Sequence, residues 1–115
     1  MRIIDILNDD AEYQQLSLED LPLAVILSDS ENNIIKILPV DVEEEKNTGL
    51  VLAYIAQQDD HFFFQIAENN NNTLFHNDEI IEKSVWLKSG DIVQIKDKII
   101  LYTVSGDKIK LSISE

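Results

Sequence analysis

From Pro22 onward the chain alternates short apolar runs, rich in β-branched and aromatic residues, with polar segments that favour turns. Apolar runs of this length and spacing, without a long amphipathic helix between them, predict an all-β fold of antiparallel strands, either a β-sandwich or a barrel. The seven runs are Leu23–Leu27, Ile34–Leu38, Leu50–Ile55, Phe62–Ile66, Ile92–Ile95, Ile99–Val104 and Ile109–Ile113.

One turn signal occurs twice, as Ser89–Asp91 and as Ser105–Asp107. In the first copy the glycine supplies backbone freedom and the aspartate can accept hydrogen bonds from the amides of the turn. We therefore expect a tight turn that lets the flanking Leu87 and Ile92 both enter the core. The second copy predicts another hairpin connection.

The alternation within the runs indicates which faces are buried. In the last run Ile109, Leu111 and Ile113 share one face and polar side chains the other, so we expect a strand at the edge of its sheet with one wet face. The runs Ile99–Val104 and Phe62–Phe64 are apolar on both faces, which requires that both faces are covered or that one meets a partner. For the phenylalanines, core and cross-strand packing is the favoured interpretation.

The first twenty residues carry a weaker pattern. Ile3, Ile4, Ile6 and Leu7 predict a strand, whereas Glu12–Leu18 fits part of a helical turn and is expected to be irregular. We therefore divide the chain into an N-terminal strand and irregular lead-in, residues 1–20, and a sandwich domain, residues 21–115.

Charge narrows the classes of partner. Nine basic against 22 acidic residues give a formal net charge of −13, which disfavours binding to nucleic acid and direct contact with anionic membranes. The acidic residues are scattered in small groups, which are more typical of solvated loops than of an acidic docking patch. The chain has no cysteine and no apolar stretch long enough to span a membrane, a composition that suits a reducing cytoplasm.

No catalytic, metal-binding or cofactor-binding pattern is present. The two histidines, His61 and His76, lack the short spacing of a typical metal pair, and neither Gly49 nor Gly90 belongs to a nucleophile elbow. Among 22 acidic residues a pair of carboxylates is uninformative. The sequence therefore predicts a protein that is not an enzyme, and a small hydrolase or metalloenzyme is the weakest of the alternatives.

A family resemblance is carried by three stretches. The segment NNTLFHNDEIIEKSVWLKSGDIVQIKDKIILYTV, with its Leu-x-x-Gly-Asp-x-Val-x-Ile core, resembles the C-terminal half of forkhead-associated (FHA) domains. Upstream, LPLAVILSDSENNIIKILP and GLVLAYI are similar to the earlier motifs of that family, with Ile26, Asn32, Ile34, Ala53 and Ile55 in register. The resemblance covers about residues 21–104 and implies an FHA/SMAD-like sandwich, which in that family has eleven strands.

The family binds phosphothreonine peptides through an arginine, a serine, a histidine and an asparagine in loops at one end of the sandwich. Here Leu27-Ser28 stands where Gly-Arg would be, and Gly49 and Leu52 replace the serine and the histidine, although a one-residue slip would let Thr48 supply a hydroxyl. Asn71 and Thr73 remain from Asn-Gly-Thr, with Asn72 in place of the glycine. Because a buried phosphate dianion needs charge-assisted donors, we expect no phosphothreonine recognition.

Two functions remain as the main alternatives. The first is a non-catalytic module that docks a protein partner; by the resemblance it would be the cytoplasmic part of a larger bacterial protein that is membrane-anchored or related to secretion. The second is a structural domain that assembles with itself through sheet edges or through an apolar patch including Trp86 or Phe62–Phe64. The candidate partner-binding residues, all in loops, are Ser28, Asp29, Ser30, Thr48, Asn69, Asn70, Asn71 and Thr73.

Overall fold

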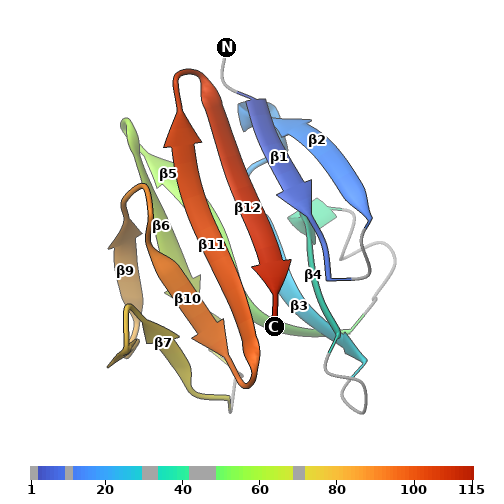
Figure 1. Ribbon diagram of the computed structural model, residues 1–115, viewed down its shortest axis with the longest axis vertical. Coiled ribbons are helices and arrows are strands. Elements are labelled where there is room, and N and C mark those ends of the chain that lie inside the picture. Colours follow the sequence, from blue (N-terminus) through green and yellow to red (C-terminus); the bar gives the residue numbers. More distant parts are fainter. Residues whose placement is uncertain (1–2, 10–11, 30–33, 42–48, 69–71) are drawn as a thin grey trace.

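A computed structural model describes residues 3–9, 12–29, 34–41, 49–68 and 72–115 of the chain, apart from the side chain of Asp29. These residues form twelve β-strands and one 3₁₀ turn (Figure 1). The elements are β1 (Ile3–Leu7), β2 (Tyr13–Ser17), η1 (Leu18–Asp20), β3 (Leu23–Asp29), β4 (Ile34–Pro39), β5 (Leu50–Gln58), β6 (His61–Ile66), β7 (Leu74–His76), β8 (Glu79–Ile80), β9 (Ser84–Leu87), β10 (Ile92–Ile95), β11 (Lys98–Ser105) and β12 (Lys108–Ser114).

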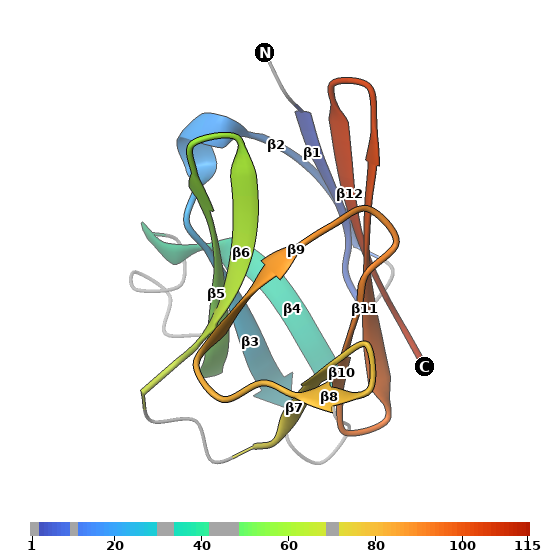
Figure 2. The ribbon, with the colours of Figure 1, turned by 90° about the vertical axis from the view of Figure 1, so that its left-hand side faces the viewer.

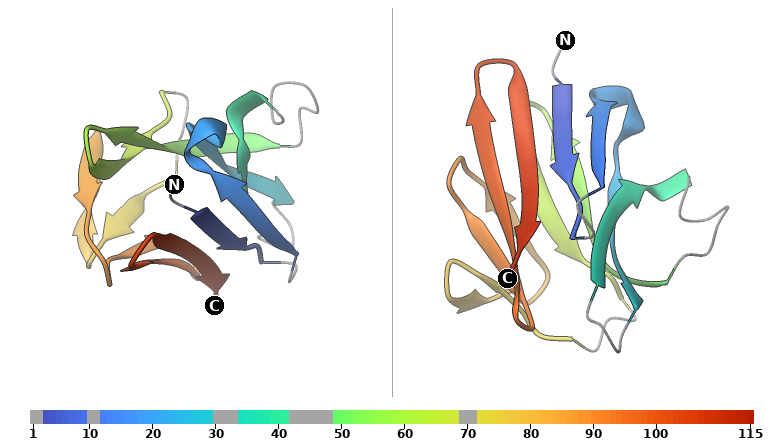
Figure 3. Two further views of the ribbon diagram at one scale, coloured as in Figure 1. Left: turned by 90° about the horizontal axis from the view of Figure 1, so that it is seen from above. Right: turned by 45° about the vertical axis from the view of Figure 1, so that its right-hand side comes forward.

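The strands form two sheets that pack face to face (Figure 2). The larger sheet has the order β2-β1-β12-β11-β10-β7-β8 and the smaller the order β4-β3-β5-β6-β9. Neighbouring strands are antiparallel except β1 and β12, which run parallel. The view from above in Figure 3 shows the two layers, and the predicted all-β sandwich is confirmed.

The core lies between the two sheets, because each sheet turns alternate apolar side chains inward. In β12 the buried residues are Ile109, Leu111 and Ile113, and in β6 they are Phe62 and Phe64. A different pattern occurs in β3, where five residues in succession, Leu23–Leu27, are at most 6% exposed. Both faces of β3 are therefore covered, which fixes this strand firmly in the fold.

The irregular segment expected after the first strand is instead β2, followed by η1. The residues of β2 pair with β1, from Ile3 opposite Ser17 to Leu7 opposite Tyr13, and so form one edge of the larger sheet. Ser17 and Asp20 then form a capping box, in which the Asp20 carboxylate accepts a hydrogen bond from the Ser17 amide at 2.8 Å. The sequence pattern missed β2 because an edge strand that is only partly buried needs few apolar residues.

Two expectations about strand position are wrong. Strand β12 lies inside the larger sheet, between β1 and β11. Its alternation reflects one buried and one solvent face, which an interior strand of a sandwich can have as well as an edge strand. Ile92 points outward and is 40% exposed, whereas Leu87 is buried as expected. Val93, the residue after Ile92 in β10, enters the core instead of Ile92.

The sequence also missed three short strands, β7, β8 and β9, which have two to four residues each. Strands β7 and β8 are joined by Asn77 and Asp78, both with positive φ values, of 48° and 72°. A two-residue hairpin turn requires this conformation, and Asn and Asp tolerate it better than most residues.

Candidate partner-binding end of the sandwich

The smaller sheet brings three chain segments together at one end. Leu27 near the end of β3 pairs with Leu50 at the start of β5, and Ala53 of β5 pairs with Ile66 at the end of β6. We call the described residues Ser28, Gly49–Val51 and Ile66–Glu68 the loop end. In Figure 2 this end of β3 and strand β7 lie at the same end of the sandwich.

Three of the eight candidate residues predicted from the sequence lie within the described part of the chain. Ser28 is partly buried at the loop end, and its Oγ donates a hydrogen bond to the carbonyl oxygen of Ile34 at 3.4 Å. Asp29 pairs with Ile34 as the last residue of β3, and Thr73 is exposed immediately before β7. The remaining candidates, Ser30, Thr48, Asn69, Asn70 and Asn71, lie outside the described residues.

Gly49 allows a close approach between β3 and the chain entering β5. A Cβ atom at this position would lie 2.6 Å from the carbonyl oxygen of Leu27 and 2.9 Å from the Cα of Ser28. Both contacts are with backbone, so a side chain could be accommodated only by moving one of the two segments.

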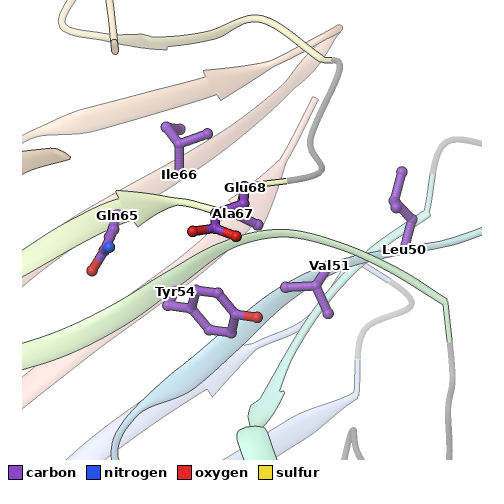
Figure 4. A pocket seen from close by; sticks show the side chains of 7 residues that line it. All are labelled: Leu50, Val51, Tyr54, Gln65, Ile66, Ala67 and Glu68. Atoms are coloured by element: carbon purple, nitrogen blue, oxygen red, sulfur yellow. The ribbon is translucent and has the colours of Figure 1, made fainter. Parts of the chain in front are cut away.

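An open hollow with a volume of about 510 Å³ lies next to this contact, lined by the start of β5 and the end of β6 (Figure 4). Leu50, at its rim, is 45% exposed. The lining residues are Leu50, Val51, Tyr54, Gln65, Ile66, Ala67 and Glu68. The sequence did not single out these positions, because partly exposed apolar residues in a strand look like ordinary core residues.

The charges around the hollow do not favour an anion. A neighbouring hollow shares Gln65–Glu68 and adds Glu82 and Lys83. The described charged residues that line the two hollows are thus two carboxylates and one ammonium group. The sequence has a single arginine, Arg2, which lies outside the described residues.

The first Ser-Gly-Asp turn is confirmed as a turn, and its aspartate pairs with a histidine of β7. Asp91 Oδ2 lies 2.8 Å from His76 Nε2 and accepts a hydrogen bond from the Lys88 amide at 2.9 Å. Asp91 Oδ1 accepts a third hydrogen bond, from Asn77 Nδ2, at 3.1 Å. Partial burial alone would raise the pKa of Asp91, but the hydrogen bonds from His76, the Lys88 amide and Asn77 outweigh it and hold the pKa below its usual value.

This arrangement is structural in character. It ties the β9–β10 connection to the β7–β8 turn, since Ile92 also donates its amide hydrogen to Asn77 Oδ1 at 3.0 Å. Ser89, the hydroxyl residue of the turn, uses its Oγ to accept a hydrogen bond from the Val104 amide at 2.9 Å. The donors and acceptors of this cluster thus bind one another, and they join the β7–β8 turn, the β9–β10 connection and β11.

A second charged cluster joins the start of β11 to two chain segments. Lys98, which is 5% exposed, places its Nζ 2.9 Å from Asp9 Oδ2 and 2.9 Å from Glu115 Oε1. The hydrogen bonds to Glu115 and Asp9 raise the pKa of Lys98 above its usual value. Because the two carboxylates meet the buried ammonium group, this cluster also serves the fold.

Comparisons with known protein families, curated proteins and solved structures find no match for this chain. Within the described ranges, no three histidine, cysteine, aspartate or glutamate residues lie together in a way that could hold a metal ion. The described part of the chain also contains no helix that is long and apolar enough to cross a membrane. The geometry of the loop end is therefore what bears on function.

Proposed function

We propose that the chain is a non-catalytic protein-interaction module, an FHA-like domain that has lost the phosphothreonine pocket and docks a protein partner at the loop end without phosphate. The observation that carries the proposal is the hollow beside Gly49, which combines exposed apolar surface with few and mostly negative charges. Loops at the end of a rigid sandwich are common positions for binding residues.

Charge supports the phosphate-independent form of the proposal. A phosphate dianion that leaves water needs several charge-assisted donors, whereas Lys83 is the one cation among the described residues that line the two hollows, and Glu68 and Glu82 would repel the ligand. An apolar or neutral side chain of a partner requires no such donors. It can fill the hollow against Val51 and Tyr54, whose side chains point to the same side in Figure 4, and remove their surface from water.

The sequence resemblance supports the fold and the location in the cell. The twelve described strands in two sheets agree in kind with the eleven-stranded sandwich of FHA domains. Degenerate domains of this type act as cytoplasmic docking modules of larger bacterial membrane-anchored or secretion-related proteins, and we extend that role to this chain. The absence of cysteine is compatible with a reducing compartment.

The test uses an array of peptides, each synthesised with threonine and with phosphothreonine. We expect binding of unmodified peptides with no gain on phosphorylation, and a loss of about tenfold in affinity for Leu50→Asp, because a carboxylate at the rim opposes burial of an apolar side chain. The matched control is Ile80→Asp, a change at another exposed apolar residue, in β8, which should leave this binding unchanged. Selective binding of phosphothreonine peptides that is insensitive to Leu50→Asp would refute the proposal.

Self-assembly is the second candidate, and one exposed aromatic residue favours it. Trp86 on the edge strand β9 is 53% exposed, and its ring stacks edge-on against Phe63 and His61, with centroid distances of 5.7 and 5.9 Å. Phe62 and Phe64 are buried, so from the predicted phenylalanine patch Phe63 is the residue that can contribute. Light scattering over a wide concentration range tests this: a monomer at every concentration would count against assembly.

Assembly through sheet edges has less support. At the edge strand β4, the amide hydrogen of Ile37 is bonded to the buried side-chain oxygen of Asn8 at 2.8 Å. This donor is therefore not available to a strand from another molecule. Such blocking of edges is a common way in which β-proteins avoid association.

A further inference from the structure

An apolar row crosses the outer face of the larger sheet, the face toward the viewer in Figure 1. The strand registers align Tyr13 with Leu7, Leu7 with Ser112, Ser112 with Leu101, and Leu101 with Ile92. We call these five residues the outer row. Four of its five members are apolar or aromatic, although they point away from the core.

In β1, β10, β11 and β12 the residues next to these are buried, and because side chains alternate between the two faces of a strand, those of the outer row point outward. Ile6, Ile100 and Val93 are at most 2% exposed, whereas Leu7, Leu101 and Ile92 are 36%, 38% and 40% exposed. Tyr13 at the end of the row is 59% exposed. The next row of the same face adds more apolar surface at Ile99, Phe75 and Ile80, since Gln94 pairs with both Ile99 and Phe75, and Phe75 pairs with Ile80.

Two lysines of β12 flank the outer row. Lys108 lies 3.0 Å from the Asp5 carboxylate, which also accepts hydrogen bonds from the Tyr13 hydroxyl at 2.8 Å and from Gln15 Nε2 at 3.2 Å. The hydrogen bonds from Tyr13 and Lys108 hold the pKa of Asp5 below its usual value, so this carboxylate is charged and fully engaged. Lys110, by contrast, pairs with no carboxylate among the described residues.

These groups surround a third hollow, of about 400 Å³, lined by Asp5, Leu7, Tyr13, Lys108 and Lys110. An anionic group placed here meets the ammonium group of Lys110 next to the apolar surface of Leu7. Such a combination recognises a carboxylate on a segment that also presents apolar side chains.

The local charge of this face differs from that of the whole chain. On the described strands that carry the outer row, the charged side chains of the outer face are Lys108, Lys110 and Asp5, and Asp5 is paired with Lys108. The chain as a whole has a net charge of −13. At physiological salt, charges are screened beyond about 8 Å, so the nearby lysines dominate for a group that docks on this face. A symmetric contact with a second copy would offer Lys110 the Asp5 carboxylate as the one acidic group on the outer face of these described strands. That carboxylate is already paired with Lys108, so the contact is unfavourable.

We propose that the outer row is a second interaction surface, which docks an acidic amphipathic segment of a partner protein. Apolar side chains of the segment cover Leu7, Leu101 and Ile92, and a carboxylate pairs with Lys110. This surface goes beyond the proposed loop-end site, because it is built from strand faces of the larger sheet and shares no residue with the loop end.

The test selects short random peptides displayed on phage against the full chain and then measures the affinity of the enriched peptides in solution. We expect the enriched sequences to combine Asp or Glu with Leu, Ile or Phe, and to lose about tenfold in affinity for both Lys110→Glu and Leu101→Asp. The matched charge control is Lys88→Glu, in the β9–β10 connection, which should change the affinity less than about twofold. An unchanged melting temperature of the Lys110 variant shows that its loss of binding is not a loss of fold.

Other outcomes overturn the proposal. Enriched peptides that lack carboxylates, an equal loss for Lys88→Glu, or no enrichment at all would each do so. A dimer seen by light scattering that Leu101→Asp disrupts would assign the row to a second copy. Peptides that lose affinity for Leu50→Asp but not for Leu101→Asp would support the loop end and refute the outer row, so the two proposals fail separately.

Discussion

The two Ser-Gly-Asp tripeptides offer a matched pair of substitutions, because identical sequence has different contacts in the two places. The carboxylate of Asp91 meets three donors, on His76, Asn77 and the Lys88 amide, at 2.8 to 3.1 Å. The side chain of Asp107 is exposed, and its backbone carbonyl accepts a hydrogen bond from the Ile3 amide. We predict that Asp91→Ala destabilises the fold and that Asp107→Ala hardly does.

The size of the effect follows from the donors left behind. Hydrogen bonds to a charged group contribute about 1.5–3 kcal/mol each when buried, but the Asp91 side chain is 13% exposed and the His76 side chain 20% exposed, so water replaces part of the loss. We expect Asp91→Ala to lower the free energy of unfolding by about 2–3 kcal/mol. Asp91→Asn keeps one acceptor oxygen but loses the charge, and should lower it by about 1 kcal/mol.

The same contacts predict a dependence on pH. Because the pKa of Asp91 in the folded protein lies below the unfolded value of 3.8, the unfolded chain binds the proton more tightly. The stabilisation is therefore complete well above pH 3.8 and is lost as the pH falls through the folded-state pKa. Asp91→Asn should remove this part of the acid destabilisation, and the stability difference between the two proteins should shrink as the pH falls.

Urea unfolding followed by circular dichroism at neutral and acidic pH measures all of these quantities. Asp107→Ala and Asp107→Asn are the controls for the change in charge and in local sequence. If the Asp91 and Asp107 variants lost equal stability, or if the Asp91→Asn difference grew on acidification, the assignment of Asp91 as the acceptor that holds the three segments together would be wrong.

The remaining predictions use the same unfolding measurement. Gly90 and Gly106 have φ values of 95° and 60°, and residues with a side chain adopt the second value more readily than the first. Gly90→Ala should therefore lower the free energy of unfolding by about 2–3 kcal/mol and Gly106→Ala by about 1 kcal/mol. Equal losses would argue against the turn geometry. Gly49→Ala should cost about 1–3 kcal/mol, because its Cβ would contact the backbone of β3, and no loss would mean that the loop end is looser than described. Phe64→Ala should lower the free energy of unfolding by about 3–5 kcal/mol and Phe63→Ala by about 1 kcal/mol. The reason is that Phe64 is 1% exposed, whereas Phe63 lies on the outer face; the reverse order would contradict the register of β6.

The strands with strong apolar patterns could be predicted from the sequence. The run Ile92–Ile95 coincides with β10, and the run Ile109–Ile113 lies within β12 with the expected face buried. These segments alternate apolar and polar residues because one face of each strand packs on the other sheet. The pattern indicates burial, so it fails where burial is partial: β2, β7, β8 and β9 were not predicted.

Long-range pairing was beyond the sequence pattern. Nothing in Ser89–Asp91 and Ser105–Asp107 distinguishes the two turns, because the partners of Asp91 come from His76 and Asn77 in another hairpin. The interior position of β12 likewise depends on its parallel pairing with β1, a hundred residues earlier in the chain. Local propensity cannot encode contacts of this kind.

The candidate site was predicted in part. Sequence reasoning directed attention to Ser28, which belongs to the loop end, and to Asp29, the last residue of β3. It missed the hollow, because Leu50, Val51 and Ile66 look like core residues when only their hydrophobicity is considered. Which of them are exposed depends on how the two sheets pack: Leu50 is 45% exposed, whereas Ile66 packs against the core.

The two proposed surfaces share one physical property, namely that described strands hold them in place. The loop end is braced by β3, which is buried on both faces, and by the close contact at Gly49. The outer row lies across β1, β12, β11 and β10, whose opposite faces form the core. Side chains on such strands lose little freedom on binding, so their affinity is expected to depend on the fit and charge of the partner more than on rearrangement of this chain.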